Sequence, residues 1–165
     1  MHGKYKFKME KLLIITPVKD SIQTTLDTIH AIMESRITTP HSYTIYNDNS
    51  TAENTAILEK EAEKYGFRLV NICDLTDHPS PNYLLVLQMA QREALEQNAG
   101  LCIVESDVTV KPDTLQRLFD GAKTRKDCGI AAAVTVDGNG DINYPYLYAK
   151  GRENQEYETK KHCSF

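Results

Sequence analysis

The hydrophobic residues of the chain gather in short runs that alternate with amphipathic stretches. Four of these runs predict strands, and they cover residues 12–16, 43–46, 67–72 and 101–104. The first is typical of a strand buried on both faces of a sheet, and the fourth is also expected to be buried. Small apolar residues predict a further strand over 129–136. None of the runs approaches the roughly 20 apolar residues that a membrane span needs.

The stretches between the runs have the pattern of helices. The first of them spaces four apolar residues along one helical face: Ile22, Leu26, Ile29 and Met33. Asp20 or Ser21 is placed to cap its start. The second opens on a capping box at 50–53 and ends at Gly66, a favoured C-terminal stop.

Two more helices follow along the chain. A loop over 74–82 contains Pro79 and Pro81 and precedes a helix over 83–97. The last helix covers 112–124, begins with proline, and turns three apolar residues inward: Leu115, Leu118 and Phe119. A polar, glycine-rich turn follows at 137–141.

Alternation of strand and helix predicts an α/β fold, a mostly parallel sheet flanked by helices. Right-handed crossovers place the carboxyl ends of parallel strands at one edge, where ligands of open α/β sheets bind. We therefore expect function at the polar residues that follow the strands. The expected organisation is an N-terminal arm (1–11), one α/β domain (12–150) and a polar tail (151–165).

Composition narrows the function classes. The 165 residues are 41% hydrophobic, and 23 acidic against 19 basic side chains give a formal charge of -4. This balance argues against nucleic acid and anionic membranes as partners. The four cysteines form no C-x-x-C pair, and no signal peptide is evident. We therefore expect a cytoplasmic protein without disulfides, with Cys102 and Cys128 in the core.

The most informative segment is the end of the fourth predicted strand, where Glu105 and Asp107 flank Ser106. Two carboxylates at this spacing suit a hard divalent cation, Mn²⁺ or Mg²⁺, which neutralises a diphosphate. A pair of solvated acids explains the same pattern equally well. A general acid/base pair is the weaker alternative, because no feature of the sequence indicates a perturbed environment.

Polar clusters also follow the first two strands. In the second cluster, 47–50, Asp48 is able to accept hydrogen bonds from a base or ribose, or else simply serves the turn. The first cluster, 16–20, contains no glycine-rich phosphate loop, so a metal or Lys19 would have to balance phosphate charge. Three clusters after three strands are expected to meet at one edge.

This combination resembles the inverting, sugar-nucleotide-dependent glycosyltransferases of the GT-A fold, the group that includes cellulose and chitin synthases. The family's P-x-y-N, D-D-G-S, N-x-A-x-x-x-A and D-x-D motifs look like residues 17–20, 47–50, 88–94 and 105–107. Asp replaces Asn at position 20, Asn replaces the first Asp at 47 and Gly at 49, Gln replaces Asn at 88, and Glu replaces Asp at 105.

The resemblance implies a donor-binding part of an enzyme that transfers a sugar from a nucleotide diphosphate to an acceptor hydroxyl with inversion. It assigns Glu105 and Asp107 to the metal. It implies that the nucleotide sugar is bound by the following residues: Pro17, Val18, Asp20, Asn47, Asp48, Asn82 and Ser106. Asn82 alternatively caps the helix that follows it. The catalytic base is expected beyond residue 165, and His162 reads as a tail histidine.

Two other classes stay open. A nucleotidyltransferase of the related fold is disfavoured because its usual glycine-rich opening loop is missing. A non-enzymatic α/β module, such as a receiver domain, matches poorly at Asp20 and Asp74. The acceptor (saccharide, lipid or protein), a peripheral membrane location and homo-oligomer formation are left open by the sequence.

Overall fold

The computed structural model describes residues 9–125 and 128–141. The chain divides into two compact units, Met1–Gln116 and Arg117–Phe165. The first unit contains a four-stranded sheet of order β3-β2-β1-β4 in which every pair is parallel. Its strands are β1 (Lys11–Val18), β2 (His41–Asn47), β3 (Arg68–Asn71) and β4 (Ala99–Ile103).

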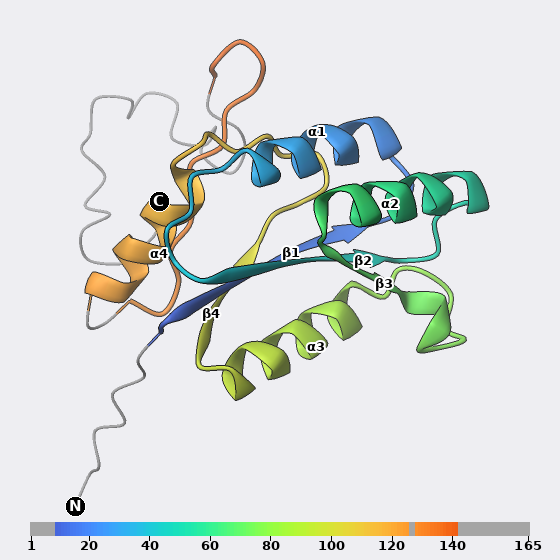
Figure 1. Cartoon of the computed structure of the whole chain (residues 1–165), viewed down its shortest axis with the longest axis horizontal. Helices are drawn as coiled ribbons and strands as arrows, with labels where there is room; N and C mark the ends of the chain where they lie inside the picture. Colours follow the sequence, from blue (N-terminus) through green and yellow to red (C-terminus); the bar gives the residue numbers. More distant parts are fainter. Residues whose placement is uncertain (1–8, 126–127, 142–165) are drawn as a thin grey trace, which may run out of the picture. The chain divides into compact units, whose positions relative to one another are not determined.

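The helices are α1 (Ile22–Met33), α2 (Ala52–Tyr65), the short 3-10 helix η1 (Ile72–Asp74), α3 (Tyr83–Glu96) and α4 (Thr114–Thr124). Helices α1, α2 and α3 connect the strands as the sequence predicts, α4 follows the last strand, and the 3-10 helix η1 was not predicted. Figure 1 shows α1 and α2 on one face of the sheet and α3 on the other. The predicted parallel α/β fold is confirmed.

The core forms because successive residues of a strand point to opposite faces. Ile15 and Tyr46 pack with Val86 and Ala90 of α3, while the adjacent Ile14 of β1 points to the face covered by α1 and α2. On that face the hydroxyl of buried Tyr43 donates to Thr16 Oγ1 (3.0 Å). A sheet covered on both sides leaves its strand ends as the accessible positions.

Several local predictions needed correction. The buried face of α1 is formed by Thr25, Thr28, Ile29 and Ile32, so Met33 is exposed and the predicted apolar stripe is shifted. The threonines are accommodated because their hydroxyls bond back to helical carbonyls; Thr28, for example, donates to Thr24 O (3.1 Å). Ser21 lies at the N-cap position, but neither it nor Asp20 caps α1 through its side chain.

The start of α2 is displaced by one residue from the predicted capping box. Thr51 is the N-cap and accepts from the Asn54 backbone (3.3 Å), whereas Ser50 contacts a different loop. Gly66 ends the helix with φ 75°, as predicted. Lys11, assigned to the arm, instead begins β1. Residues 1–8 of that arm, the tail and His162 lie outside the described residues.

The second unit carries the largest correction. Residues 129–136 form no strand apart from a single bridge at Val136, and Ile130 is 77% exposed. Small apolar residues satisfy the strand pattern, but nothing in the described sequence of this unit buries them. Cys128 is only half-buried, contrary to the predicted core position. The predicted turn at 137–141 is confirmed, since Asp137 Oδ1 accepts hydrogen bonds from the backbone N–H groups of Asn139 and Asp141.

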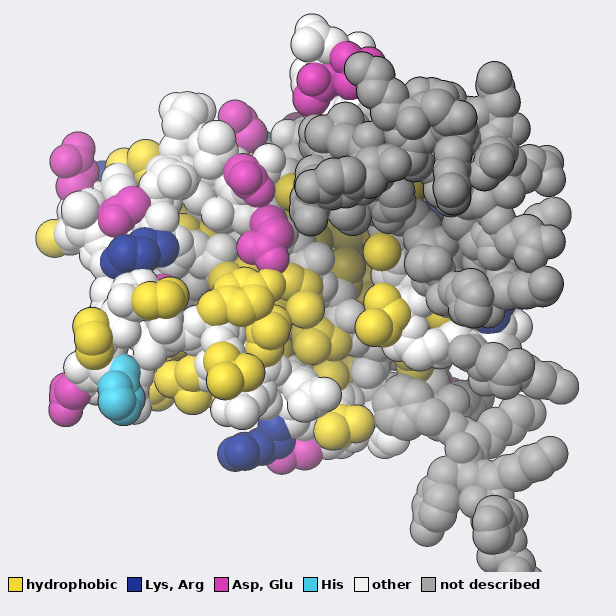
Figure 2. All heavy atoms as spheres, turned by 180° about the vertical axis from the view of Figure 1, so that it is seen from behind, with side chains coloured by type: hydrophobic (Ala, Val, Ile, Leu, Met, Phe, Trp, Pro, Cys, Tyr) yellow, Lys and Arg dark blue, Asp and Glu magenta, His cyan; other side chains and the backbone are white. Residues whose placement is uncertain are grey.

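Some apolar side chains of the first unit reach the surface. Leu75, Tyr83, Leu84, Leu95 and Ile103 are all exposed. Figure 2 shows hydrophobic side chains gathered in the middle of one face of the molecule, with acidic side chains above them. Among the helices of the described residues, none has the length and apolarity to span a bilayer.

Candidate functional site

Asp48 is the centre of a hydrogen-bonded cluster at the carboxyl edge of the sheet. It follows β2, is only 7% exposed, and its backbone N–H donates to Val18 O at the end of β1 (2.7 Å). Its carboxylate accepts from Ser80 Oγ (2.6 Å), the Asn82 backbone (2.7 Å) and Asn82 Nδ2 (2.8 Å). Asp48 therefore joins the β2 end to the loop before α3.

These bonds determine the charge state of Asp48. Burial alone would raise its pKa, but the hydrogen bonds from Ser80 and Asn82, with Lys19 nearby, outweigh burial and hold the pKa below its ordinary value. The carboxylate is thus ionised at neutral pH and engaged by protein donors. A base or ribose would have to compete with those donors to contact Asp48.

The loop before α3 extends this cluster to the fourth strand. Asn82 is 8% exposed and occupies the N-cap position of α3, yet its side chain makes no capping bond; it donates instead to Asp48 and to His78 O. The next residue, Tyr83, donates through Oη to Glu105 Oε1 (2.7 Å). Burial and this bond to Glu105 raise the pKa of Tyr83 to about 12, so it remains a donor at neutral pH.

A second network holds the β1 and β2 ends together. Asp20 Oδ1 accepts from the Thr51 backbone (2.8 Å) and from Asn54 Nδ2 (3.0 Å), and the Asp20 backbone donates to Ser50 Oγ (2.8 Å). The bond from Thr51, and then that from Asn54, lowers the pKa of Asp20. Asp20 therefore anchors the start of α2 rather than α1.

Left-handed backbone conformations explain two residue choices in these loops. Asp20 has φ 52° and Asn49 has φ 57°. Asn, Asp and Gly tolerate this region best. Asp20 and Asn49 stand where the resembled motifs have Asn and Gly, and both residue types are compatible with the left-handed conformation that the two loops adopt.

Asn47 is committed to the fold. It is buried, its Nδ2 donates to Thr55 Oγ1 (3.0 Å) and Asn71 Oδ1 (2.9 Å), and its Oδ1 accepts from the Ser50 backbone (3.2 Å). Both hydrogens of Nδ2 are used within the fold, so the side chain has no donor left for direct recognition of a ligand in this arrangement. Its position at the β2 end is as expected, and its contacts are those of a turn.

The first-strand loop offers mainly backbone and one cation. Pro17 is half-buried, while the Val18 side chain is buried in the core. Lys19 is exposed, and its ammonium donates to Asp48 O (3.4 Å) and Asn49 O (3.1 Å). Among the described residues, Asn49 Oδ1 is buried without a hydrogen-bond partner.

Glu105 and Asp107 lie exposed on the turn after β4, with Ser106 half-buried between them. The Val108 backbone closes the turn on Glu105 O (3.2 Å). No described group of three or more His, Cys, Asp or Glu is placed to hold a metal ion. Two carboxylates and a hydroxyl are nevertheless an all-oxygen donor set, which suits Mg²⁺ or Mn²⁺ shared with substrate phosphates and water.

Hydrogen bonds join three of the predicted site residues, Asp48, Asn82 and Glu105, with the help of two residues that the sequence reasoning did not assign. Asp20 and Asn47 instead belong to the second network, around Ser50. Ser80 and Tyr83 supply the donors that link Asp48 and Glu105 to the loop before α3. Neither has a sequence signal of its own, since a serine in a loop and a tyrosine at a helix start are ordinary. Only the proximity of 81–83 to the expected ligand was open to prediction.

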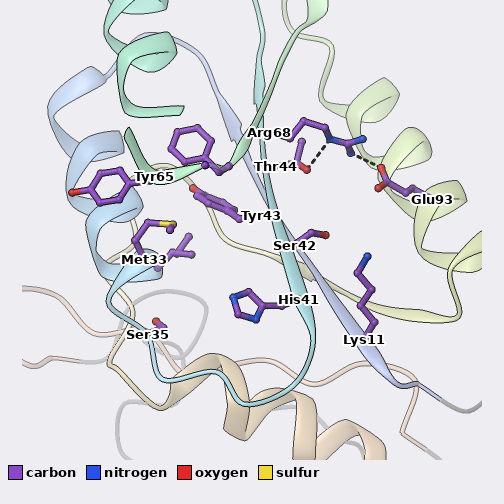
Figure 3. A pocket seen from close by; sticks show the side chains of 13 residues that line it. Lys11, Met33, Ser35, His41, Ser42, Tyr43, Thr44, Tyr65, Arg68 and Glu93 are labelled. Carbon is purple, nitrogen blue, oxygen red and sulfur yellow. Dashed lines mark hydrogen bonds and ion pairs between the residues drawn. The ribbon is translucent and has the colours of Figure 1, made fainter. Parts of the chain in front are cut away.

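A cavity of about 430 Å³ lies at the opposite, amino end of the strands. Its lining includes Met33, His41, Tyr43, Tyr65 and Phe67. Figure 3 shows Tyr43, Tyr65 and Met33 on one side of β2 and Lys11, Arg68 and Glu93 on the other. The strand therefore divides the lining, and none of the predicted site residues contributes to it.

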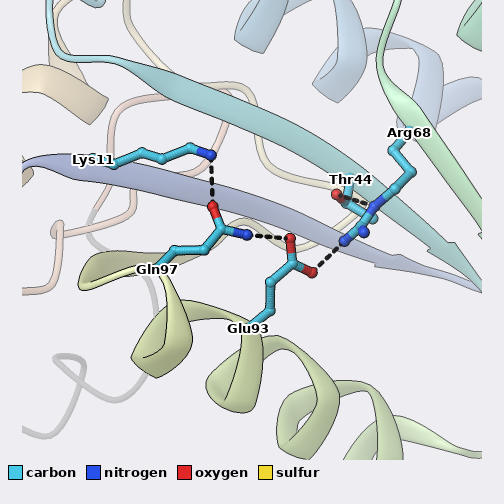
Figure 4. Close-up of polar contacts among 5 residues, drawn as sticks. All are labelled: Lys11, Thr44, Arg68, Glu93 and Gln97. Carbon is cyan, nitrogen blue, oxygen red and sulfur yellow. Dashed lines mark hydrogen bonds and ion pairs between the residues drawn. The ribbon is translucent and has the colours of Figure 1, made fainter.

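A network of hydrogen bonds and one ion pair links α3 to the strands beside this cavity. Lys11 donates to Gln97, Gln97 donates to Glu93, and Glu93 pairs with Arg68, which also donates to Thr44 Oγ1 (Figure 4). Each charged group in this network already has a partner. We infer that this network of polar contacts holds α3 against the sheet.

An open parallel sheet with a polar cluster at its carboxyl edge is the arrangement of α/β domains that bind nucleotides. No family model matches the sequence, and no curated protein matches it. Solved structures with the same fold are known, however. The mannosyltransferase PcManGT from Pyrobaculum calidifontis, in complex with GDP-Man and Mn²⁺, aligns with a TM-score of 0.52 at 16% identity, over 69% of this chain and 32% of that one.

TarS 1-349 from S. aureus aligns with a TM-score of 0.47 at 19% identity, over 68% of this chain and 33% of that one. TarS 1-349 in complex with UDP-GlcNAc gives the same TM-score at 20% identity. The chain spans about a third of the length of these structures. The likeness to PcManGT confirms the expected GT-A fold.

Proposed function

We propose that this chain is the donor-binding part of a glycosyltransferase that uses a nucleotide-diphosphate sugar and a divalent cation. The observation that carries the proposal is a pair of links made by adjacent residues: Asn82 donates to Asp48, and Tyr83 donates to Glu105. These links bring the ends of β2 and β4 to one place at the sheet edge. The fold shared with a mannosyltransferase solved with GDP-Man and Mn²⁺ supports this choice.

In the proposed site, Glu105 and Asp107 would hold Mn²⁺ or Mg²⁺, and such an ion would supply positive charge against the diphosphate. Pro17, the Val18 backbone and Asn82 face the nucleotide, and Ser106 faces the phosphates. Asp20, Asn47 and Asp48 keep the loops in the shape that receives it. An acceptor hydroxyl then attacks the anomeric carbon as the nucleotide diphosphate leaves, with inversion; we assign no catalytic base within this chain.

Ligand-dependent thermal stability tests the proposal. At a ligand concentration of about 100 times Kd, binding stabilises the folded state by about 2.7 kcal/mol, which corresponds to a rise in Tm of about 5–10 °C for a protein of this size. We expect this rise with UDP or GDP in the presence of Mn²⁺. Chelation by EDTA removes the metal-dependent part of it.

The matched variants are Asp107→Asn and Asp27→Asn, which neutralise an exposed acid inside and outside the site. Asp27 lies on α1 and is exposed. The first variant is expected to lose the effect of Mn²⁺ and the second to keep it. If neither nucleotide changes Tm, with or without Mn²⁺, the proposed function is wrong. The cytoplasmic location stays a prediction.

A further inference from the structure

Glu105 occupies a position where the resembled motif has aspartate, and the extra methylene gives its carboxylate an additional rotatable bond. The residue is exposed and sits on a turn, so neighbouring side chains do not pack around it. Within residues 9–125 and 128–141, the Glu105 carboxylate accepts one hydrogen bond, from Tyr83 Oη to Oε1 (2.7 Å). No described donor reaches the second oxygen, Oε2.

Tyr83 is itself fixed at its base. It is the first residue of α3 and directly follows Asn82, whose backbone and side chain both donate to buried Asp48. The Val86 backbone donates to Asn82 O (3.1 Å), which starts the helix on that anchored residue. The tyrosine ring is 41% exposed and reaches across to the β4 turn. The donor, the Tyr83 hydroxyl, therefore belongs to a residue with an anchored backbone, whereas the acceptor, the Glu105 carboxylate, is on a flexible side chain.

We propose that Tyr83 is a positioning residue for the cation: its hydroxyl binds one oxygen of Glu105 and presents the other beside Asp107. This inference rests on the proposed function, because it concerns the same cation. Partners that orient a metal-binding side chain through a hydrogen bond commonly change metal affinity about tenfold or more when removed. Because this bond is exposed to water, we expect the lower end of that range.

The test measures Mn²⁺ binding by the loss of the free-ion EPR signal, with UDP or GDP present at a fixed concentration. Four forms of the whole chain are compared: wild type, Tyr83→Phe, Glu105→Asp and the double variant. Tyr65→Phe serves as the matched control, because Tyr65 ends α2 and lines the cavity at the amino end of the strands.

We expect Tyr83→Phe to weaken Mn²⁺ binding about tenfold, and Tyr65→Phe to leave it unchanged. In the Glu105→Asp background the shorter acid no longer meets the hydroxyl, so removing that hydroxyl should have no further effect. A purely structural role for Tyr83 would weaken binding equally in both backgrounds, and that result would overturn the inference.

The outcomes separate the two proposals. If wild type binds nucleotide with Mn²⁺ and Tyr83→Phe binds as tightly, the positioning role is wrong and the proposed function stands. If wild type binds no Mn²⁺ even with nucleotide present, the proposed function fails and the inference falls with it.

Discussion

Replacing Asp48 by asparagine tests whether the site is built around this carboxylate. The three hydrogen bonds that Asp48 accepts come from Ser80 and Asn82. Two of them converge on Oδ2, so the amide of an asparagine would turn its oxygen to that side and its NH₂ toward Asn82 Nδ2. One bond is then lost to a donor–donor contact, and two become neutral.

The cost follows from these contacts. A hydrogen bond to a charged group contributes about 1.5–3 kcal/mol, roughly twice a neutral one. One lost bond and two weakened bonds therefore give a destabilisation of about 3–6 kcal/mol, with the lower values favoured if water enters. Urea unfolding at pH 7 measures it. Ser80→Ala removes one donor and leaves no orphan, so it should cost about half as much.

Lowering the pH provides an independent test of whether Asp48 is charged in the folded state. The folded-state pKa of Asp48 lies below the ordinary 3.8, so its contribution is present above that value and is lost as pH falls through the folded pKa. The stability difference between wild type and Asp48→Asn should be constant from neutral pH down to about pH 5 and shrink below pH 3.8.

Ser35→Ala is the control, because Ser35 follows the end of α1 and its hydroxyl donates to a carbonyl of the last turn of that helix, Ala31 O (2.9 Å). It should change stability by less than about 0.5 kcal/mol. A difference for Asp48→Asn as small as that of Ser35→Ala, or one that does not change with pH, would refute the reasoning.

Two further substitutions test the scaffold that carries the site. In Gly66→Ala the new Cβ meets no neighbouring atom, so the cost comes from backbone strain at φ 75°. Urea unfolding should show that the free energy of unfolding falls by about 1–2 kcal/mol. An unchanged free energy of unfolding would contradict a left-handed cap. Tyr43→Phe removes the buried donor to Thr16 Oγ1, with an expected loss of about 1 kcal/mol by the same assay and no change in nucleotide binding. A change in binding would contradict the assignment of Tyr43 to the core.

The sheet could be predicted because its strands are buried on both faces, which forces continuous apolar runs such as 12–16 and 101–104. The same logic failed at 129–136, where small apolar residues satisfy the pattern without any described neighbour to bury them. Helix starts were harder to place, since Ser50 and Thr51 are both good caps. The choice between them depends on Asp20, which lies 31 positions away from Thr51.

The candidate site was predictable in its location and much less so in its contacts. Parallel topology alone places the ends of β1, β2 and β4 at one edge. It does not determine which polar groups satisfy one another there. Asp48 and Asn82 are both plausible ligand contacts as single residues, yet they are nearly buried and bond to each other. Pairings of this kind depend on loop conformations that no periodic pattern encodes.

The way these groups pair bears on how a nucleotide sugar would be recognised. Asp20, Asn47 and Asp48 use their side chains to connect loops, so they contribute shape rather than direct contacts. Direct contacts then fall to exposed atoms, chiefly the carboxylates of Glu105 and Asp107. Loops already held by hydrogen bonds lose little conformational entropy when a ligand binds. Specificity would therefore depend on the rigidity of the loops, and affinity on the cation held by the two acids.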